Sequence, residues 1–464
     1  MSARLCEAAL AGLPAEVERP RYDRRKVRAG VVHLGLGAFH RAHQAYVFHE
    51  LLQTGHLDWG VTAACIHSPK VRDQLAPQDG LYCLLEREGE MRRARVCGAI
   101  GHVLVAAEAP QRLAAAIADP AVALVTLTIT EKGYDDAKGP IWAVLAAGLE
   151  RRRALGAPLT ILSCDNLADN GRLARQAVLG AAGASALAAW IGRACAFPSS
   201  MVDRITPATL AVDRDEAAGR LGVRVEACVV AEPFWQWVVE NRFAARAPPL
   251  EQAGVELVSD VAPWERAKLR LLNAAHSALA YAGLLCGFVH VHEAIAWPPL
   301  RDLVERLWDE AAETLGPVPG LDVRRYRADL MRRLRNPSLQ HRLDQIAADG
   351  SGKLPPRLLA SLAERQDRGL TSPALGFALA CWIRCLDGVD DRGGEIRLSD
   401  PLLARLQAWR HEGTDGISLM VQAGMIAPGS SIAASPELLA RQLAALRIAG
   451  ARTGLAGLGR LQWR

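Results

Sequence analysis

The pattern of hydrophobic and polar positions changes along the chain near residue 260. Before that point, short β-branched runs predict strands, and amphipathic stretches between them predict helices. The predicted strands are Val27–Leu34, Trp59–Ile66, Val122–Thr130 and Leu159–Ser163, and the predicted helices include Pro69–Leu75 and Pro110–Ala118. This alternation is typical of a parallel, doubly wound α/β sheet.

After residue 260, long amphipathic helical patterns replace the short strands. They cover Trp264–Cys286, Pro298–Thr314, Val323–Arg335, Pro356–Glu364, Ser372–Leu386, Leu402–Ala408 and Pro436–Ile448. Prolines at positions 248, 249 and 263 mark the joint. We therefore predict two domains, residues 1–260 with the sheet and residues 261–464 mainly α-helical.

A glycine turn follows the first predicted strand. The segment Gly35-Leu-Gly37 leads into a helix-like stretch, Ala42–Gln53. In a Rossmann-like domain, small residues at this turn let backbone N–H groups approach the pyrophosphate of a dinucleotide. The usual third glycine is replaced by His40, so an ordinary strand-to-helix turn is the alternative. The predicted cofactor contacts are Gly35, Gly37, Ala38 and Phe39.

The end of the second predicted strand bears on the type of cofactor. No acidic residue, the usual partner of the ribose 2′-hydroxyl, follows the strand before Asp73. Ser68, Lys70 and Arg72 stand there instead, and the positive charges of Lys70 and Arg72 beside the Ser68 hydroxyl suit a 2′-phosphate. We predict NAD with NADP as a possibility, and Ser68 and Lys70 as cofactor contacts. The alternative is a solvated loop.

One predicted helix in the second half carries polar residues in a hydrophobic setting. At about 100° per residue, Glu265, Asn273 and His276 lie on the same side as Lys268. A buried lysine loses proton affinity, because a poor dielectric disfavours the ammonium form, and then suits a general base. Amide and imidazole N–H groups suit an oxygen whose charge changes during reaction. This combination indicates alcohol–carbonyl chemistry. Its alternative is a snorkelling lysine, a solvated Arg270 and Asn273, and a hydrogen-bonded core histidine.

Composition narrows the class of protein. The 464 residues are 50% hydrophobic and 23% charged, which is typical of a soluble globular chain, and the net charge of +5 is scattered, so we expect no nucleic-acid partner. No apolar run is long enough to span a bilayer and the N-terminus lacks a signal-peptide layout, which predicts a cytoplasmic protein without a membrane partner. The ten dispersed cysteines suit reduced thiols. We expect no metal site, the nearest approach being His290-Val-His292-Glu293.

Several ordered motifs resemble the mannitol dehydrogenase family of long-chain polyol dehydrogenases, which includes mannitol 2-dehydrogenase, arabinitol dehydrogenase and fructuronate reductase. The resemblance covers most of the chain. Its segments are residues 33–43, Thr128-Ile-Thr-Glu-Lys-Gly-Tyr134, Ser163-Cys-Asp-Asn-Leu167, residues 197–204, Glu232-Pro-Phe234, the predicted helix around Lys268 (residues 263–276, called the lysine helix below), Asn336-Pro-Ser-Leu-Gln-His-Arg342 and Asp349-Gly-Ser-Gly-Lys353.

The resemblance implies a metal-independent hydride transfer between a nicotinamide and a secondary alcohol of an open-chain sugar derivative. It assigns Lys268 as general base, Asn273 with Asn166 as the pair that polarises the reacting oxygen, and His276 as a ligand of a substrate hydroxyl. It further implies that Asp203 and Lys353 contact the polyol and that Glu265 and Glu131 carry the proton to solvent. The alternatives are a helix cap for Asn166 and Asp165, pairing of Asp203 with Arg204, and an exposed loop acid for Glu131.

The substrate end departs from the mannitol branch. A second basic residue is expected there eight positions before Lys353, but this chain has Gln345. The segments around Arg342 and Lys353 are more like fructuronate reductase, and a substrate carboxylate would suit Arg342, Lys353 or Arg357. Gln345 and Arg342 are therefore predicted substrate contacts, with mannitol, arabinitol, mannonate and altronate all open. The other open functions are a sugar-phosphate polyol dehydrogenase and a non-catalytic dinucleotide-binding regulator, and the chain is expected as a monomer or homo-oligomer.

Overall fold

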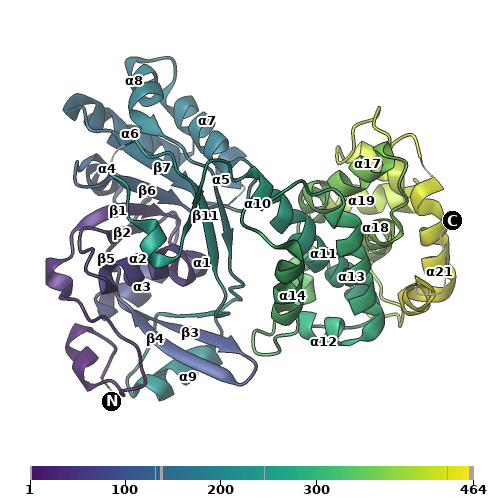
Figure 1. Cartoon of the computed structure of the whole chain (residues 1–464), viewed down its shortest axis with the longest axis horizontal. Coiled ribbons are helices and arrows are strands. Elements are labelled where there is room, and N and C mark those ends of the chain that lie inside the picture. Colours follow the sequence, from purple (N-terminus) through teal and green to yellow (C-terminus); the bar gives the residue numbers. More distant parts are fainter. Residues whose placement is uncertain (1–2, 131, 136–138, 245, 436, 459–464) are drawn as a thin grey trace. The chain divides into compact units, whose positions relative to one another are not determined.

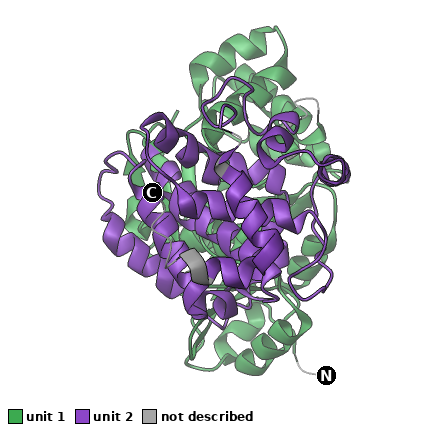
Figure 2. Ribbon diagram, turned by 90° about the vertical axis from the view of Figure 1, so that its right-hand side faces the viewer, with its two compact units in different colours: residues 1–262 green, residues 263–464 purple. Residues whose placement is uncertain are grey.

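A computed structural model describes residues 3–130, 132–135, 139–244, 246–435 and 437–458 (Figure 1). The chain divides into two compact units, Met1–Ala262 and Pro263–Arg464 (Figure 2). The first unit holds a parallel sheet and the second is built of helices. The predicted fold class, a Rossmann-like α/β domain followed by a mainly helical domain, is confirmed.

The main sheet of the first unit is parallel throughout. Its strands lie in the order β5-β2-β1-β6-β7-β8. Their bounds are β1 Ala29–Leu34, β2 Gly60–Cys65, β5 Ile100–Val105, β6 Leu124–Leu127, β7 Leu159–Ser163 and β8 Cys195–Ala196. This is the doubly wound order of dinucleotide-binding domains, and the direction of winding reverses between β1 and β6. Ligands bind such sheets at the carboxyl ends of the strands beside that reversal.

Helices cover both faces of this sheet because its strands are buried on both sides. Val31 of β1 packs into one core, whereas its neighbour Val32 packs into the other. One face carries α1 Ala38–Ala42, α2 Gln44–Gln53 and α3 Lys70–Leu75, and the other carries α4 Pro110–Ala118, α6 Pro140–Leu155, α7 Asn170–Ala182 and α8 Ala186–Ala194. A short helix, α5, spans Lys132–Asp135.

Two small sheets, absent from the sequence prediction, complete the first unit. One has the order β10-β3-β4 (Cys228–Ala231, Tyr82–Glu88, Met91–Cys97), and the other has the order β12-β11-β9 (Glu256–Val258, Gln236–Glu240, Ser200–Asp203). Helix α9, Ala211–Leu221, leads into β10. β3 and β4 form a hairpin, but β10 pairs with β3 and β9 pairs with β11 across long sequence separations, which local patterns do not report.

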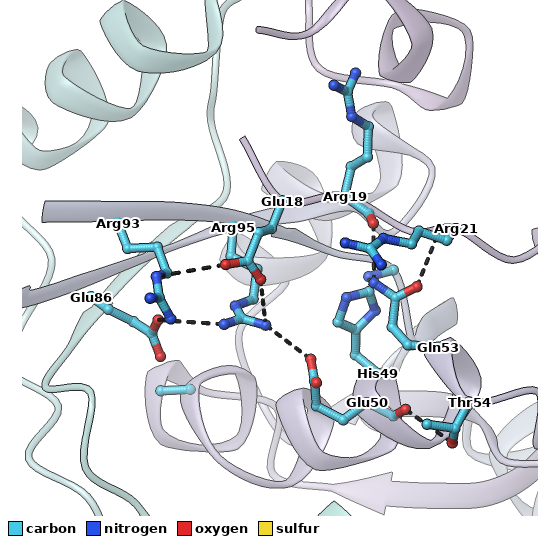
Figure 3. Close-up of polar contacts among 12 residues, drawn as sticks. Glu18, Arg19, Arg21, His49, Glu50, Gln53, Thr54, Glu86, Arg93 and Arg95 are labelled. Atoms are coloured by element: carbon cyan, nitrogen blue, oxygen red, sulfur yellow. Dashed lines mark hydrogen bonds and ion pairs between the residues drawn. The ribbon is translucent and has the colours of Figure 1, made fainter. Parts of the chain in front are cut away.

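A charged network fastens the first small sheet to α2 (Figure 3). The guanidinium of Arg95 on β4 lies 2.8 Å from the Glu18 carboxylate and 3.0 Å from that of Glu50 on α2. Glu86 on β3 accepts from Arg204 at 2.6 Å, and both side chains are almost fully buried. These charges have partners on their own chain, so their burial is compensated.

The second unit is built around one long helical element. It comprises α10 (Ala262–Ala267), a π-helical segment (Lys268–Asn273) and α11 (Ala274–Leu285), and every residue of α11 except Leu284 is buried. The surrounding helices are α12 Val291–Ala296, α13 Pro298–Ala312, α14 Val323–Leu334, α15 Leu343–Ala347, α16 Gly350–Leu354, a second π segment Pro355–Leu359, α17 Ala360–Asp367, α18 Pro373–Cys385, α19 Leu403–His411, α20 Gly416–Gln422 and α21 Glu437–Leu458.

Candidate active site

The glycine turn after β1 lies at the reversal of the main sheet. Gly35 has φ 104°, and a Cβ there would come within 2.0 Å of the Thr128 carbonyl oxygen, so the fold itself requires glycine. At Gly37 the nearest atom to such a Cβ is 3.7 Å away, so the fold does not. Ala38 and Phe39 follow, half-buried, at the start of α1. The room left at Gly37 fits a group that approaches the backbone from outside.

A stacked histidine pair lies beneath this turn. The rings of His33 and His40 are 3.3 Å apart, nearly parallel and fully buried. His33 bonds the hydroxyls of Thr126 and Thr128 at 2.9 and 3.0 Å, and the Thr128 hydroxyl donates to the Gly35 carbonyl at 2.9 Å. Burial lowers the pKa of His33 to about 3, so its ring is neutral. Sequence reasoning missed this support, although polar residues in a hydrophobic strand were its signal.

Ser68 and Lys70 stand just beyond the carboxyl end of β2, the strand next to β1. Both are exposed, and the Ser68 hydroxyl accepts from the Lys70 backbone N–H at 3.3 Å. Arg72 instead forms ion pairs with Asp73 and Glu108. Ser68 and the ammonium group of Lys70 are therefore exposed just after the strand that neighbours the glycine turn.

The turn after β7 is organised by a buried carboxylate. Asp165 accepts from the backbone N–H groups of Ile129 and Thr130 at 3.2 and 2.8 Å and from the Tyr134 hydroxyl at 2.7 Å. Burial raises the pKa of Asp165, while these hydrogen bonds oppose the rise. Asp165 thus ties the β6 and β7 turns together instead of capping a helix. The next residue, Asn166, is exposed at the same edge.

Two further predicted residues belong to the first unit. Asp203 ends β9, is 3% exposed and pairs in register with Gln236 of β11. The neighbouring Arg204 donates to Glu86, to the Glu232 carbonyl and to the Ala42 carbonyl. Glu131 lies outside the described residues.

In the second unit, four predicted residues share the long helical element. Glu265, Lys268, Asn273 and His276 are all buried, with 7 to 9% of each residue exposed. The prediction of a uniform α-helix was wrong between Lys268 and Asn273, where the backbone is π-helical. A π turn bonds i to i+5 and holds an extra residue, so 100° per residue does not apply across it.

Two side-chain nitrogens on this element are buried without a hydrogen-bond partner among the described residues. They are Nδ2 of Asn273 and Nε2 of His276. Burial, the nearby His341 and the cations Arg357, Arg333 and Lys268 hold the pKa of His276 well below its usual range. The imidazole is therefore neutral, and an unsatisfied polar group in such a place indicates a ligand or water partner.

Another polar residue of the element, Arg270, has a structural role. Arg270 donates to the Thr314 carbonyl at 2.9 Å and forms an ion pair with Glu364 at 2.5 Å. It is 6% exposed. The sequence-based alternative of a solvated arginine is therefore wrong, because this guanidinium fastens the π segment to α17.

The residues predicted at the substrate end occupy different surroundings. Lys353 is half-buried on α16, just before the second π segment, whereas Gln345 is exposed on α15. Arg342 is exposed and forks onto Asp344 at 3.0 and 2.7 Å. Of the three, Lys353 alone is partly enclosed.

The segment His290-Val-His292-Glu293, the nearest approach to a metal site in the sequence, forms the beginning of a helix. Glu293 accepts from the His290 backbone N–H at 3.0 Å at the beginning of α12. Within the described residues, no group of three or more His, Cys, Asp or Glu side chains is arranged to hold a metal ion. Among all the described residues, no helix is long and apolar enough to cross a membrane.

Comparisons with known proteins agree over both units. A model described as the mannitol dehydrogenase Rossmann domain matches residues 29–252, and one described as the mannitol dehydrogenase C-terminal domain matches residues 260–443. Mannitol 2-dehydrogenase of Pyrenophora tritici-repentis (strain Pt-1C-BFP) is 38% identical over 86% of this chain and 76% of its own. D-mannonate oxidoreductase of Escherichia coli (strain K12) is 37% identical, with 87% and 90% covered.

A solved relative extends the agreement to three dimensions. The structure of Pseudomonas fluorescens mannitol 2-dehydrogenase, a ternary complex with NAD and D-mannitol, superposes with a TM-score of 0.88 and 34% identity, covering 98% of this chain and 99% of that one. The resemblance carried by the motifs is confirmed, and the chain belongs to the mannitol dehydrogenase family.

Proposed function

We propose that this protein is an NAD-dependent oxidoreductase that interconverts a secondary alcohol of an open-chain polyol or aldonate with the corresponding ketone. The observation that carries the proposal is the pair of buried, unsatisfied nitrogens on Asn273 and His276, about one and two helical turns beyond the buried Lys268. A polyol supplies oxygens for both. Family membership supports the same reaction class, because relatives are named mannitol 2-dehydrogenase and D-mannonate oxidoreductase.

The glycine turn supports NAD as the cofactor. Its place at the sheet reversal and the room at Gly37 suit a pyrophosphate, and the solved relative is a complex with NAD. A bound nicotinamide supplies or accepts the hydride. Gly35, Gly37, Ala38 and Phe39 bind the cofactor, while Ser68 and Lys70 contact its ribose end.

Lys268 is the proposed general base. Its burial disfavours the ammonium form, so the amine takes the alcohol proton as hydride leaves the same carbon. Asn273 and Asn166 donate to the reacting oxygen without changing their own charge. His276, Asp203 and Lys353 hold other hydroxyls, and Glu265 with Glu131 passes the proton to solvent. Metal independence is part of this proposal.

A scan of NADH and NADPH oxidation against fructose, fructuronate, tagaturonate and xylulose tests the proposal. We expect turnover of at least one open-chain keto-sugar, and absence of turnover with all four would contradict it. Lys70→Glu tests the ribose end separately. We expect a larger loss of activity with NADPH than with NADH, and an unchanged ratio of the two activities would remove Lys70 from the cofactor site.

A non-catalytic dinucleotide-binding regulator predicts no turnover to lose. A sugar-phosphate polyol dehydrogenase predicts faster turnover of fructose 6-phosphate than of fructose. The same assay, with fructose 6-phosphate added to the substrates, therefore separates both alternatives from the proposal.

A further inference from the structure

The glycine turn of this chain departs from the usual dinucleotide fingerprint at one position. The usual turn has a third glycine three residues after the second, and that glycine lets the helix pack closely on the strand. Here His40 of α1 occupies the position. Its ring lies flat on the ring of His33 from β1, with 3.3 Å between the centroids and 9° between the planes. Helix and strand are therefore joined by two stacked rings at the place where the usual turn has no side chain.

The hydrogen bonds of His33 run in one direction. The Thr128 hydroxyl has a single proton and donates it to the Gly35 carbonyl at 2.9 Å, so it accepts from the Nε2–H of His33 at 3.0 Å. Burial lowers the pKa of His33 to about 3, and a neutral ring with its proton on Nε2 accepts at Nδ1 from the Thr126 hydroxyl at 2.9 Å. The bonds therefore lead from Thr126 through His33 and Thr128 to the carbonyl of the glycine turn.

The Gly35 residue is held from both neighbouring strands. Its N–H donates to the Ala64 carbonyl of β2 at 2.9 Å, and its carbonyl accepts from Thr128, just after β6. The same carbonyl oxygen is the atom nearest to a Cβ built at Gly37, 3.7 Å away. The atom that Thr128 holds therefore borders the room left at Gly37 for a ligand.

We propose that His33, His40 and Thr128 are positioning residues for the cofactor, which fix the glycine turn ready for the dinucleotide and take the place of the third glycine. This inference rests on the proposed function and concerns how its cofactor site is held. Both rings are fully buried, so they act through the backbone of the turn. A turn that is fixed before the ligand arrives loses less conformational freedom on binding, which strengthens the affinity.

Thr128→Val and Thr126→Val form a matched pair. Each replaces one hydroxyl that is bonded to His33 by a methyl group of similar size, but only Thr128 also bonds the glycine turn. The Kd for NADH is measured by fluorescence titration of the full-length protein, so the readout does not depend on turnover. We expect Thr128→Val to raise this Kd roughly 3- to 10-fold, as for loss of one hydrogen bond, and Thr126→Val to change it less than about twofold. The two thermal midpoints should fall by similar amounts.

Two further variants sharpen the test. Thr128→Ser keeps the hydroxyl and should keep the Kd for NADH within about twofold of wild type. His40→Gly restores the usual third glycine, yet it should weaken NADH binding more than Thr128→Val does, because the stack on His33 is lost. In steady-state assays these losses should appear in KM for NADH, with kcat changed less than about twofold. The threonine variants decide the question if His40→Gly does not fold.

The outcomes separate this inference from the proposed function. An unchanged Kd in Thr128→Val, equal increases in Thr126→Val and Thr128→Val, or tighter NADH binding by His40→Gly would overturn the positioning role and leave the oxidoreductase intact. Selective loss in Thr128→Val without turnover of any keto-sugar by the wild type supports the positioning role and overturns the proposed reaction. A wild-type protein that binds neither NADH nor NADPH overturns both.

Discussion

The turn after β7 and the lysine helix both bury polar groups, but they treat them differently. In the first, the Asp165 carboxylate receives three hydrogen bonds from its own chain. In the second, nitrogens of Asn273 and His276 are buried without a partner in the described residues. Because unsatisfied burial costs free energy, the first arrangement stabilises the fold, and we propose that the second is retained for a ligand. Stability and activity should therefore respond in opposite ways to substitutions in the two places.

The largest expected effect is on the lysine helix. Lys268→Ala removes the proposed general base and should lower kcat about 10³- to 10⁴-fold, as for loss of acid–base catalysis. The thermal midpoint should change little. Steady-state kinetics and a melting curve on the same preparation check both halves. Lys26→Ala, at an exposed lysine of the first unit, is the control and should retain full activity.

The β7 turn should show the converse behaviour. Asp165→Ala leaves two backbone N–H groups and the Tyr134 hydroxyl without their acceptor, and should destabilise the fold by about 3 to 5 kcal/mol. Urea unfolding measures this loss, and Asp165→Asn should recover part of it by keeping one acceptor oxygen. A variant as stable as wild type would mean that the carboxylate is not a structural tie.

Asn273 sharpens the comparison further. Asn273→Ala removes a buried donor that lacks a partner, so the free energy of unfolding should change by less than about 1 kcal/mol. The value of kcat/KM should nevertheless fall about 10²- to 10³-fold, the range for loss of an oxyanion donor. Denaturation and kinetics together decide, and a large loss of stability with normal kinetics would place Asn273 in the structural class.

How far these places were visible in the sequence depends on the range of the contacts that make them. The glycine turn and the strands β1 and β7 follow from local patterning, and so does the buried helix that carries Lys268. The π segment was not visible, because its residue types equally suit an α-helix. The pairings of β3 with β10 and of β9 with β11 join strands that are far apart along the chain, and α6 is rich in small residues and arginine with weak periodicity. The stacking of His33 on His40 and the anchoring of Arg357 on Ser277 exist only after folding.

Glu310 in α13 is hydrogen-bonded to its own chain, yet its burial still disfavours the charged carboxylate. The pH dependence of stability shows which of the two effects is larger. It accepts from the backbone N–H groups of Ala374 and Leu375 at the start of α18, yet burial raises its pKa to about 7. In the unfolded chain it titrates near 4.5. Between these values the folded state keeps a proton that the unfolded state releases, so stability falls as pH rises from about 4.5 to about 7, by up to about 3 kcal/mol.

The Glu310→Gln variant cannot ionise at this position, so its unfolding free energy should change less than that of wild type across the same window. Urea unfolding at intervals between about pH 4.5 and pH 8 provides the measurement. Identical slopes for the two proteins would show that the Glu310 carboxyl ionises as easily in the fold as in water. In that case the two backbone hydrogen bonds to Glu310 would fully offset the effect of burial on its pKa. The hydrogen bonds to Asp165 in the first unit, by contrast, only oppose that effect.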